Sequence, residues 1–299
     1  MNIIKETKSD RIFNFINSLI LTLLLLMVLY PLIFIVSASI SDPDLVNQGK
    51  VWLFPRGITF DGYRRVFQDA QIWNGYRNTI FYTVVGTVLN LLVTLPAAYS
   101  LSRKDFYGRN FFTAIFTFTM FFGGGLIPTY LLYSNLGMRN TIWAMLIPGL
   151  AGMWNIIISR TYFQNSIPGE LKEAAEMDGC TNMRLFAQII LPLSAPIIAV
   201  MALFYGVGHW NSFFNALIYL SDKKLFPLQL ILREILVQNV MSAQMMTSGE
   251  DLDLMAKQAK IADMIKYAVI IVSTLPVLAA YPFIQKYFVQ GIMVGAIKG

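Results

Sequence analysis

Residues 16–36 read INSLILTLLLLMVLYPLIFIV and contain no charged side chain. A transmembrane helix needs about 20 consecutive apolar residues, whereas the apolar part of a secretory signal peptide spans only about 7–15. The stretch is therefore predicted to be a retained transmembrane helix. Its continuous apolar character also favours a helix over a barrel strand, in which apolar and polar residues would alternate.

Five further charge-free segments follow, at residues 80–101, 111–134, 141–159, 193–220 and 267–285. Together with the first, they predict an all-α polytopic membrane protein with six transmembrane helices. The third segment contains Gly123, Gly124 and Gly125 followed by Pro128, a combination that predicts a bend or a local unwinding.

The composition agrees with a membrane location. Hydrophobic residues make up 56% of the 299 residues and charged residues only 13%, at a mean hydropathy of +0.57. Because a soluble domain carries about a quarter charged residues, an ordinary soluble enzyme, a disordered chain and a nucleic-acid binder are excluded. With one cysteine and one histidine, neither a disulfide framework nor a metal centre is expected.

The segments divide the chain into an N-terminal tail (1–15), a first helix (16–36), a loop (37–79), a five-helix core (80–285) and a C-terminal tail (286–299). The basic residues divide almost evenly between the two sides of the membrane. The short loop after the second segment, however, carries Arg103, Lys104 and Arg109, and short inner loops collect basic residues. We therefore expect both termini in the cytoplasm and loop 37–79 outside.

The loop between the fourth and fifth segments, at 167–192, is the most informative part of the core. It begins with IPGELKEAAEMDG, in which Pro168 suits the first position of a helix and Gly179 its left-handed end. Thr181 can cap a second short helix that runs to Leu191, before Pro192. The sequence thus predicts two short helices joined at Asp178-Gly179.

The first of these helices carries a narrow face of small side chains. Leu171, Ala174, Ala175 and Asp178 are spaced three or four residues apart, so they share one face. An interfacial membrane helix would carry large apolar residues and basic side chains, but this one has four acids and one lysine. A protein partner inside the cell is the better interpretation.

The loop also resembles the EAA loop of ABC-importer permeases. The resemblance rests on Glu173-Ala174-Ala175, on Asp178-Gly179 three residues later, and on Leu191-Pro192 at the start of the next segment. Trp210-Asn211 and the ending GIMVGAIKG at 291–299 are similar to carbohydrate permeases of the maltose-permease second-subunit type. Within that class, the chain resembles the permeases that accompany lipoprotein receptors for oligosaccharides. The one departure is Cys180, where the family usually has alanine.

The resemblance implies an ABC type I importer permease fold and a defined set of partners. The chain would be a bacterial cell-membrane subunit without catalytic residues. It would form half of a translocation pore with a second, homologous permease. An external solute-binding protein would deliver the carbohydrate, and two cytoplasmic ATPase subunits would bind ATP and magnesium. The residues implied in contact with the ATPase are Glu173, Ala174, Ala175, Asp178, Gly179, Leu191 and Pro192, with Lys298 and Gly299 at the tail.

Two absences from the sequence fit this picture independently. The six segments hold no Asp, Glu, Lys or Arg, which ion-coupled carriers place inside the membrane. The chain also has no Gly-x-x-x-x-Gly-Lys-Ser/Thr phosphate-binding loop, so it is expected to hold no cofactor and to leave ATP hydrolysis to another polypeptide.

Aromatic and amide side chains in the fourth and fifth segments are candidates for the substrate path, because small-molecule sites combine apolar walls with a few polar groups. They are Trp154, Asn155, His209, Trp210, Asn211 and Asn215. Helix packing is the alternative for each of them. Two other functions stay open at this point, namely an ABC permease for a non-sugar solute and an ATP-independent channel or facilitator.

Overall fold

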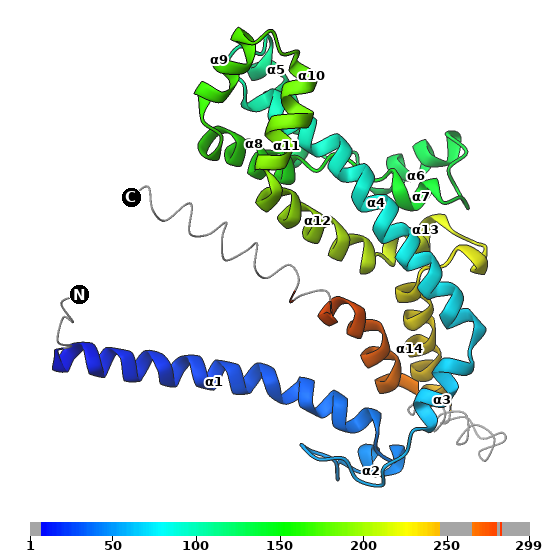
Figure 1. Ribbon diagram of the computed structural model, residues 1–299. Helices are drawn as coiled ribbons and strands as arrows, with labels where there is room; N and C mark the ends of the chain where they lie inside the picture. Colours follow the sequence, from blue (N-terminus) through cyan, green and yellow to red (C-terminus); the bar gives the residue numbers. More distant parts are fainter. Residues whose placement is uncertain (1–6, 246–264, 280–281, 283–299) are drawn as a thin grey trace. The chain divides into compact units, whose positions relative to one another are not determined.

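The computed structural model describes residues 7–245, 265–279 and 282, and every regular element in these ranges is a helix (Figure 1). The chain separates into two units, one formed by residues 1–69 with 234–274 and the other by residues 70–233 with 275–299. We describe each unit by itself.

The first unit is built on the long helix α1, Lys8–Ser39, which contains the whole of the predicted first span. The helix starts at a capping box: the Thr7 side chain accepts a hydrogen bond from the Asp10 backbone N–H, and the Asp10 carboxylate accepts one from the N–H of Thr7. Its apolar side chains are exposed along almost the entire length, as lipid-facing residues would be.

Serine side chains attach the segment after α1 to the end of that helix. The segment contains α2, Pro43–Asn47, and α3, Asp61–Gln68. The Ser37 hydroxyl donates to the carbonyl of Leu53 at 2.6 Å, and the Ser39 hydroxyl lies 2.8 Å from that of Tyr63. Each bond thus pairs a polar group of the segment, the Leu53 carbonyl or the Tyr63 hydroxyl, with a serine at the end of α1.

The second unit is organised around α4, Ala70–Ser102. This helix contains the predicted second span but begins earlier, so residues 70–79, which were assigned to the loop, are helical. Its buried positions recur every three or four residues, with Leu95 in addition: Ile72, Gly75, Thr79, Tyr82, Gly86, Asn90, Thr94, Ala98 and Leu101. The first of them face residues 225–231, since the N–H of Leu228 donates to the Thr79 hydroxyl. The later ones face α8 (Met153–Ser166) and α12 (Ala195–Trp210).

The predicted third span is broken at its glycines. It consists of α5, Arg109–Phe121, and α6, Leu126–Asn135, whose axes differ by 113°. Gly125 has φ 83°, which side chains other than hydrogen disfavour. The predicted bend at Gly123–Gly125 is therefore confirmed, and it is sharp.

The fourth and fifth spans are interrupted, although the sequence predicted continuous helices. The fourth consists of α7, Trp143–Leu146, and α8, Met153–Ser166, separated at Pro148 and Gly149. Proline removes a helical donor and Gly149 has φ 75°, which together explain the break. The fifth consists of α12, Ala195–Trp210, and α13, Phe214–Tyr219.

After the fifth span come the 3₁₀ turn η2, Lys223–Leu225, helix α14, Leu228–Met245, and the apolar helix Ile265–Ala279. Within the described ranges, α1 and α4 alone are long and apolar enough to cross a membrane as single helices. Counting the bent pairs, α5 with α6 and Asn182–Leu193 with α12, gives up to four such spans. The all-α membrane fold is thus as predicted, but the third, fourth and fifth predicted spans are interrupted, and the sixth, 267–285, lies partly outside the described residues.

Candidate functional site

The coupling loop predicted at 167–192 is helical and begins with α9, Gly169–Met177. Pro168 is the N-terminal cap, one position earlier than predicted, with extended backbone at φ −61° and ψ 138°. Glu170 lies in the first turn, where its negative charge interacts favourably with the free backbone N–H groups of the helix end.

Gly179 ends α9 with the left-handed geometry predicted for it. Its φ is 71°, its N–H donates to the carbonyl of Glu176, and the N–H of Cys180 donates to that of Ala175. This pair of hydrogen bonds is the Schellman motif, which glycine favours because it has no Cβ. Cys180 is partly buried against the cluster that contains Ala175, so its side chain makes the apolar contact that often accompanies this motif.

The second helix of the loop continues further than predicted. Thr181 caps α10, Asn182–Leu185, by accepting from the N–H of Arg184, as expected. The chain then widens into a π turn, η1 at Phe186–Ile190, and passes through Pro192 in α11, Leu191–Leu193. A π turn pairs residues five apart, so Pro192, which has no N–H, fits without ending the helix.

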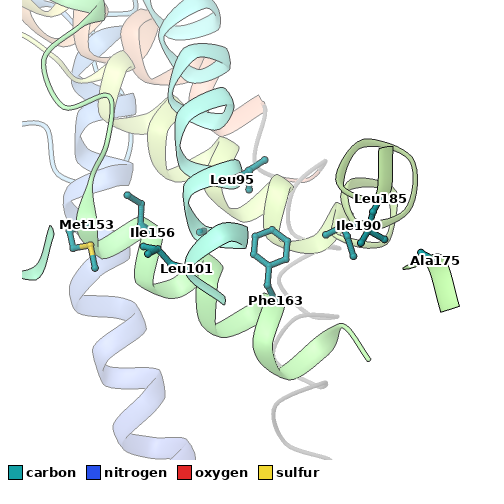
Figure 2. Close-up of a cluster of buried hydrophobic side chains, with 9 residues drawn as sticks. Leu95, Leu101, Met153, Ile156, Phe163, Ala175, Leu185 and Ile190 are labelled. Carbon is teal, nitrogen blue, oxygen red and sulfur yellow. The ribbon is translucent and has the colours of Figure 1, made fainter. Parts of the chain in front are cut away.

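The two alanines of the Glu-Ala-Ala motif face different surroundings. Ala175 is 5% exposed and belongs to a buried cluster with Leu185 and Ile190 (Figure 2). Ala174, in contrast, is exposed. The single small-residue face predicted for α9 is therefore divided between an inner and an outer side. The same cluster includes side chains from α4 and α8, namely Leu95, Ala98, Leu101, Met153, Ile156 and Phe163.

Two methionines that the sequence analysis did not select extend the outer side. Met177 is 89% exposed and follows the exposed Glu173 and Ala174 by about one turn of α9, and Met183 in α10 is 76% exposed. We call Glu173, Ala174, Met177 and Met183 the docking face. Because Met177 stands between the acids Glu176 and Asp178, the sequence itself indicates an exposed apolar side chain at this position.

A network of charged groups joins α9 to the loop after α4. Asp105 Oδ2 lies 2.5 Å from Arg103 Nη2 and 2.9 Å from Lys172 Nζ. Glu176 Oε1 lies 3.4 Å from Lys172 Nζ and 3.8 Å from Arg103 Nη2. Hydrogen bonds from Arg103 and then from Lys172 lower the pKa of Asp105, and the bond to Asp105 raises the pKa of Lys172. The sequence analysis used Arg103 only for orientation and did not find the network.

Asn90 and His209 form a polar contact inside the helical part of the second unit. The Asn90 amide nitrogen donates to the carbonyls of Gly149 and Leu150, each at 3.0 Å, so its oxygen is left as an acceptor. His209 Nε2 lies 2.7 Å from that oxygen and therefore carries the hydrogen. The bond joins α4, α12 and the break between α7 and α8.

Asn90 and His209 line a hollow of about 190 Å³, and Asn215, Ser212 and Tyr205 line it as well. Two of the six candidate path residues, His209 and Asn215, are thus brought together. Trp210 is buried and contacts Tyr76, Asn211 donates to the carbonyl of Val207, and Trp154 is exposed. Asn155 does not line the hollow either, and Lys298 and Gly299 lie outside the described residues. Asn90, the lone amide among the apolar residues of its segment, was missed.

Broken apolar helices around a small polar hollow, with an acidic helical loop exposed beside them, define a polytopic membrane transport subunit. No group of three or more potential metal ligands occurs in the part of the chain that the structure describes. Residues 70–294 match the family described as binding-protein-dependent transport system inner membrane component, and the chain belongs to this family. It is a permease subunit of an ABC transport system and not an enzyme.

Individual relatives match over nearly the whole length. Protein LplC of Bacillus subtilis is 39% identical, over 98% of this chain and 97% of its own. The polygalacturonan/rhamnogalacturonan transport system permease protein YtcP of the same organism is 37% identical, over 97% and 99%. A solved bacterial ABC transporter involved in the import of the acidic polysaccharide alginate contains a chain with 36% identity and a TM-score of 0.83, over 95% of this chain and 99% of that one.

Proposed function

We propose that the chain forms half of the translocation pore of an ATP-driven importer for oligosaccharides. Its partners would be a second, homologous permease, an external solute-binding protein, and two cytoplasmic ATPase subunits that bind ATP and magnesium. The relatives that are named as permeases for polygalacturonan/rhamnogalacturonan and for arabinooligosaccharides support the choice of cargo.

The observation that carries the proposal is the docking face. Met177 and Met183 expose large apolar side chains at the end of α9 and the start of α10, in a loop that also carries the exposed acids Glu173 and Asp178. Exposed apolar groups next to acids indicate a protein contact surface. A cleft with apolar walls and a basic group that pairs with Glu173 would complement this surface, and we assign that cleft to the ATPase subunit.

The proposed function also fixes the orientation. The ion pairs place the basic loop after α4 at the same end of the unit as α9. Because short basic loops face the cytoplasm, this end is cytoplasmic and the docking face is available to an ATPase there. We propose that both termini also lie on the cytoplasmic side, which the order of the six apolar segments in the sequence predicts.

The test is co-purification of the tagged chain with candidate ATPase subunits. Glu173→Lys reverses the charge of the docking face, Met177→Asp removes its apolar group, and Gly179→Pro breaks the end of α9. Loss of a central contact of about 1.4 kcal/mol or more reduces binding about tenfold, so each variant is expected to lose most of the bound ATPase. Met177→Leu keeps the apolar volume and serves as the matched control.

Uptake into proteoliposomes tests the cargo. The complex, with its binding protein, should accumulate labelled oligosaccharides only when ATP is present. Variants of the docking face that retain both the ATPase and ATP-driven uptake would contradict the coupling assignment. Uptake of a dipeptide but of no sugar would identify a non-sugar permease, and ATP-independent uptake by the chain alone would identify a facilitator.

A further inference from the structure

The four charged residues Arg103, Asp105, Lys172 and Glu176, here called the clamp, join two segments that are far apart in the sequence. Asp105 accepts from both cations, and Arg103 also donates through Nη1 to the Asn182 side chain at 2.6 Å. The loop after α4 is thereby bonded to α9 and to the first residue of α10. Both helices of the coupling loop are held by one arginine.

The two cations of the clamp are more shielded from water than the cation of an ordinary surface ion pair. The side chains of Arg103 and Lys172 are only 15% and 28% exposed, whereas that of Arg64, which pairs with Asp61, is 72% exposed. The acids Asp105 and Glu176 are 47% and 49% exposed, close to the 53% of Asp61. Exposed pairs contribute little, but networks of alternating charge with restricted side chains contribute more. Beneath the clamp, Ala175 packs against the same buried cluster as the end of α4.

The docking face itself does not include the clamp. Glu176 points its carboxylate at Lys172 and Arg103, although it stands between exposed residues in the sequence. Of the four acids in the loop, Glu176 thus pairs within the chain, while Glu173 belongs to the docking face. This separation gives the two acids different tasks.

The other connection from α9 into the membrane is strongly bent. It runs along the chain through the π turn at Phe186–Ile190 and then turns by 82° between Asn182–Leu193 and α12. Helix α4, in contrast, is continuous from Ala70 to Ser102 and carries Asn90, which bonds His209 at the polar hollow. A movement of α9 reaches that hollow by way of α4 only if α9 is fixed to the end of α4.

We propose that the clamp fixes α9 to the end of α4 and so transmits the movement of the ATPase to the helix that lines the polar hollow. The proposal rests on the proposed function, since it requires an ATPase seated on the docking face. The four residues touch neither the cargo nor ATP, and they are positioning residues. Asp105 is central because its contacts to the two cations, at 2.5 Å and 2.9 Å, are shorter than those of Glu176, at 3.8 Å and 3.4 Å.

The test measures coupling in the complete transporter with its binding protein. Asp105→Asn keeps the shape of the side chain but removes its charge, and Asp105→Glu keeps the charge. Asp61→Asn, which removes the exposed ion pair with Arg64, is the matched control. For each we would measure bound ATPase, ATP hydrolysis, oligosaccharide uptake per ATP, the unfolding temperature and hydrogen exchange of residues 169–177.

In Asp105→Asn, bound ATPase and hydrolysis should be unchanged, while uptake per ATP falls about threefold or more, the size expected for lost charge pairs at a partly exposed site. Exchange in α9 should be faster. Asp105→Glu should restore at least half of the lost uptake per ATP, and Asp61→Asn should behave as wild type. A purely structural role would lower uptake and hydrolysis together.

Three results would contradict the proposed role of the clamp. The first is unchanged uptake per ATP in Asp105→Asn, and the second is loss of bound ATPase in that variant, which would make Asp105 a docking residue. The third is an equal loss of uptake per ATP in Asp105→Asn and Asp105→Glu. Failure of the proposed function is distinct from all three, since the wild-type complex itself would then show no ATP-driven uptake of oligosaccharides.

Discussion

Gly86 shows how a single residue secures the centre of the second unit. A Cβ atom at this position would overlap the imidazole ring of His209. The ring cannot easily move away, because Nε2 donates to Asn90, whose amide is held in turn by the carbonyls of Gly149 and Leu150. Glycine is required here for close approach of α4 to α12 rather than for unusual backbone angles.

We expect Gly86→Ala to destabilise the permease by about 1–3 kcal/mol, the usual cost of overpacking a filled core. Thermal unfolding of the purified protein in detergent measures the effect. Gly208→Ala is the control, because a Cβ there meets no atom within 4 Å and alanine favours a helix. Equal unfolding temperatures for Gly86→Ala and wild type would show that the His209 ring moves aside without cost.

Among the elements, the broken third span was the most predictable and the π turn the least. Consecutive glycines before a proline are a local signal, so the break between α5 and α6 could be read directly. The sequence placed the end of α10 before Pro192 because proline usually interrupts a helix. The structure avoids this end by widening one turn, an adjustment that depends on how Ile190 packs in the buried cluster.

The break itself leads to a prediction about two of its three glycines. Gly125 has φ 83° and ψ 172°, a region that is essentially restricted to glycine. Gly125→Ala should therefore cost about 1–3 kcal/mol and lower the unfolding temperature. At Gly123, where a Cβ meets nothing within 4 Å and φ is not positive, alanine should be tolerated. If Gly123→Ala were less stable than Gly125→Ala, the backbone strain of the break would not lie at Gly125.

At the level of the whole second unit, the clamp joins two segments that are distant in the sequence and makes the stability of the fold depend on pH. The pKa of Asp105 is lowered by its bonds to Arg103 and Lys172. A carboxylate with a lowered folded-state pKa stabilises the fold fully above its unfolded value of about 3.9, and this stabilisation is lost as the pH falls through the lowered value.

The difference in unfolding temperature between wild type and Asp105→Asn should accordingly be constant from about pH 5.5 to pH 8 and should shrink below about pH 4. Unfolding in detergent across this range checks it. The pKa of Lys172 is raised, so its contribution is retained up to alkaline pH and does not disturb the plateau. A difference that changes between pH 6 and pH 7 would assign the effect to another group.

The apolar segments, the acidic loop and the end of α9 at Gly179 could all be predicted, because hydropathy and the φ preference of glycine act over a few neighbouring residues. The hydrogen bond of Asn90 to His209 could not be predicted, since it joins residues 119 positions apart. The same holds for the clamp and for the division of Ala174 from Ala175. Which of two adjacent alanines is buried, and which of several acids finds a cation, depends on how α4, α8 and α9 pack together. Packing between distant segments leaves no periodic trace in a single sequence.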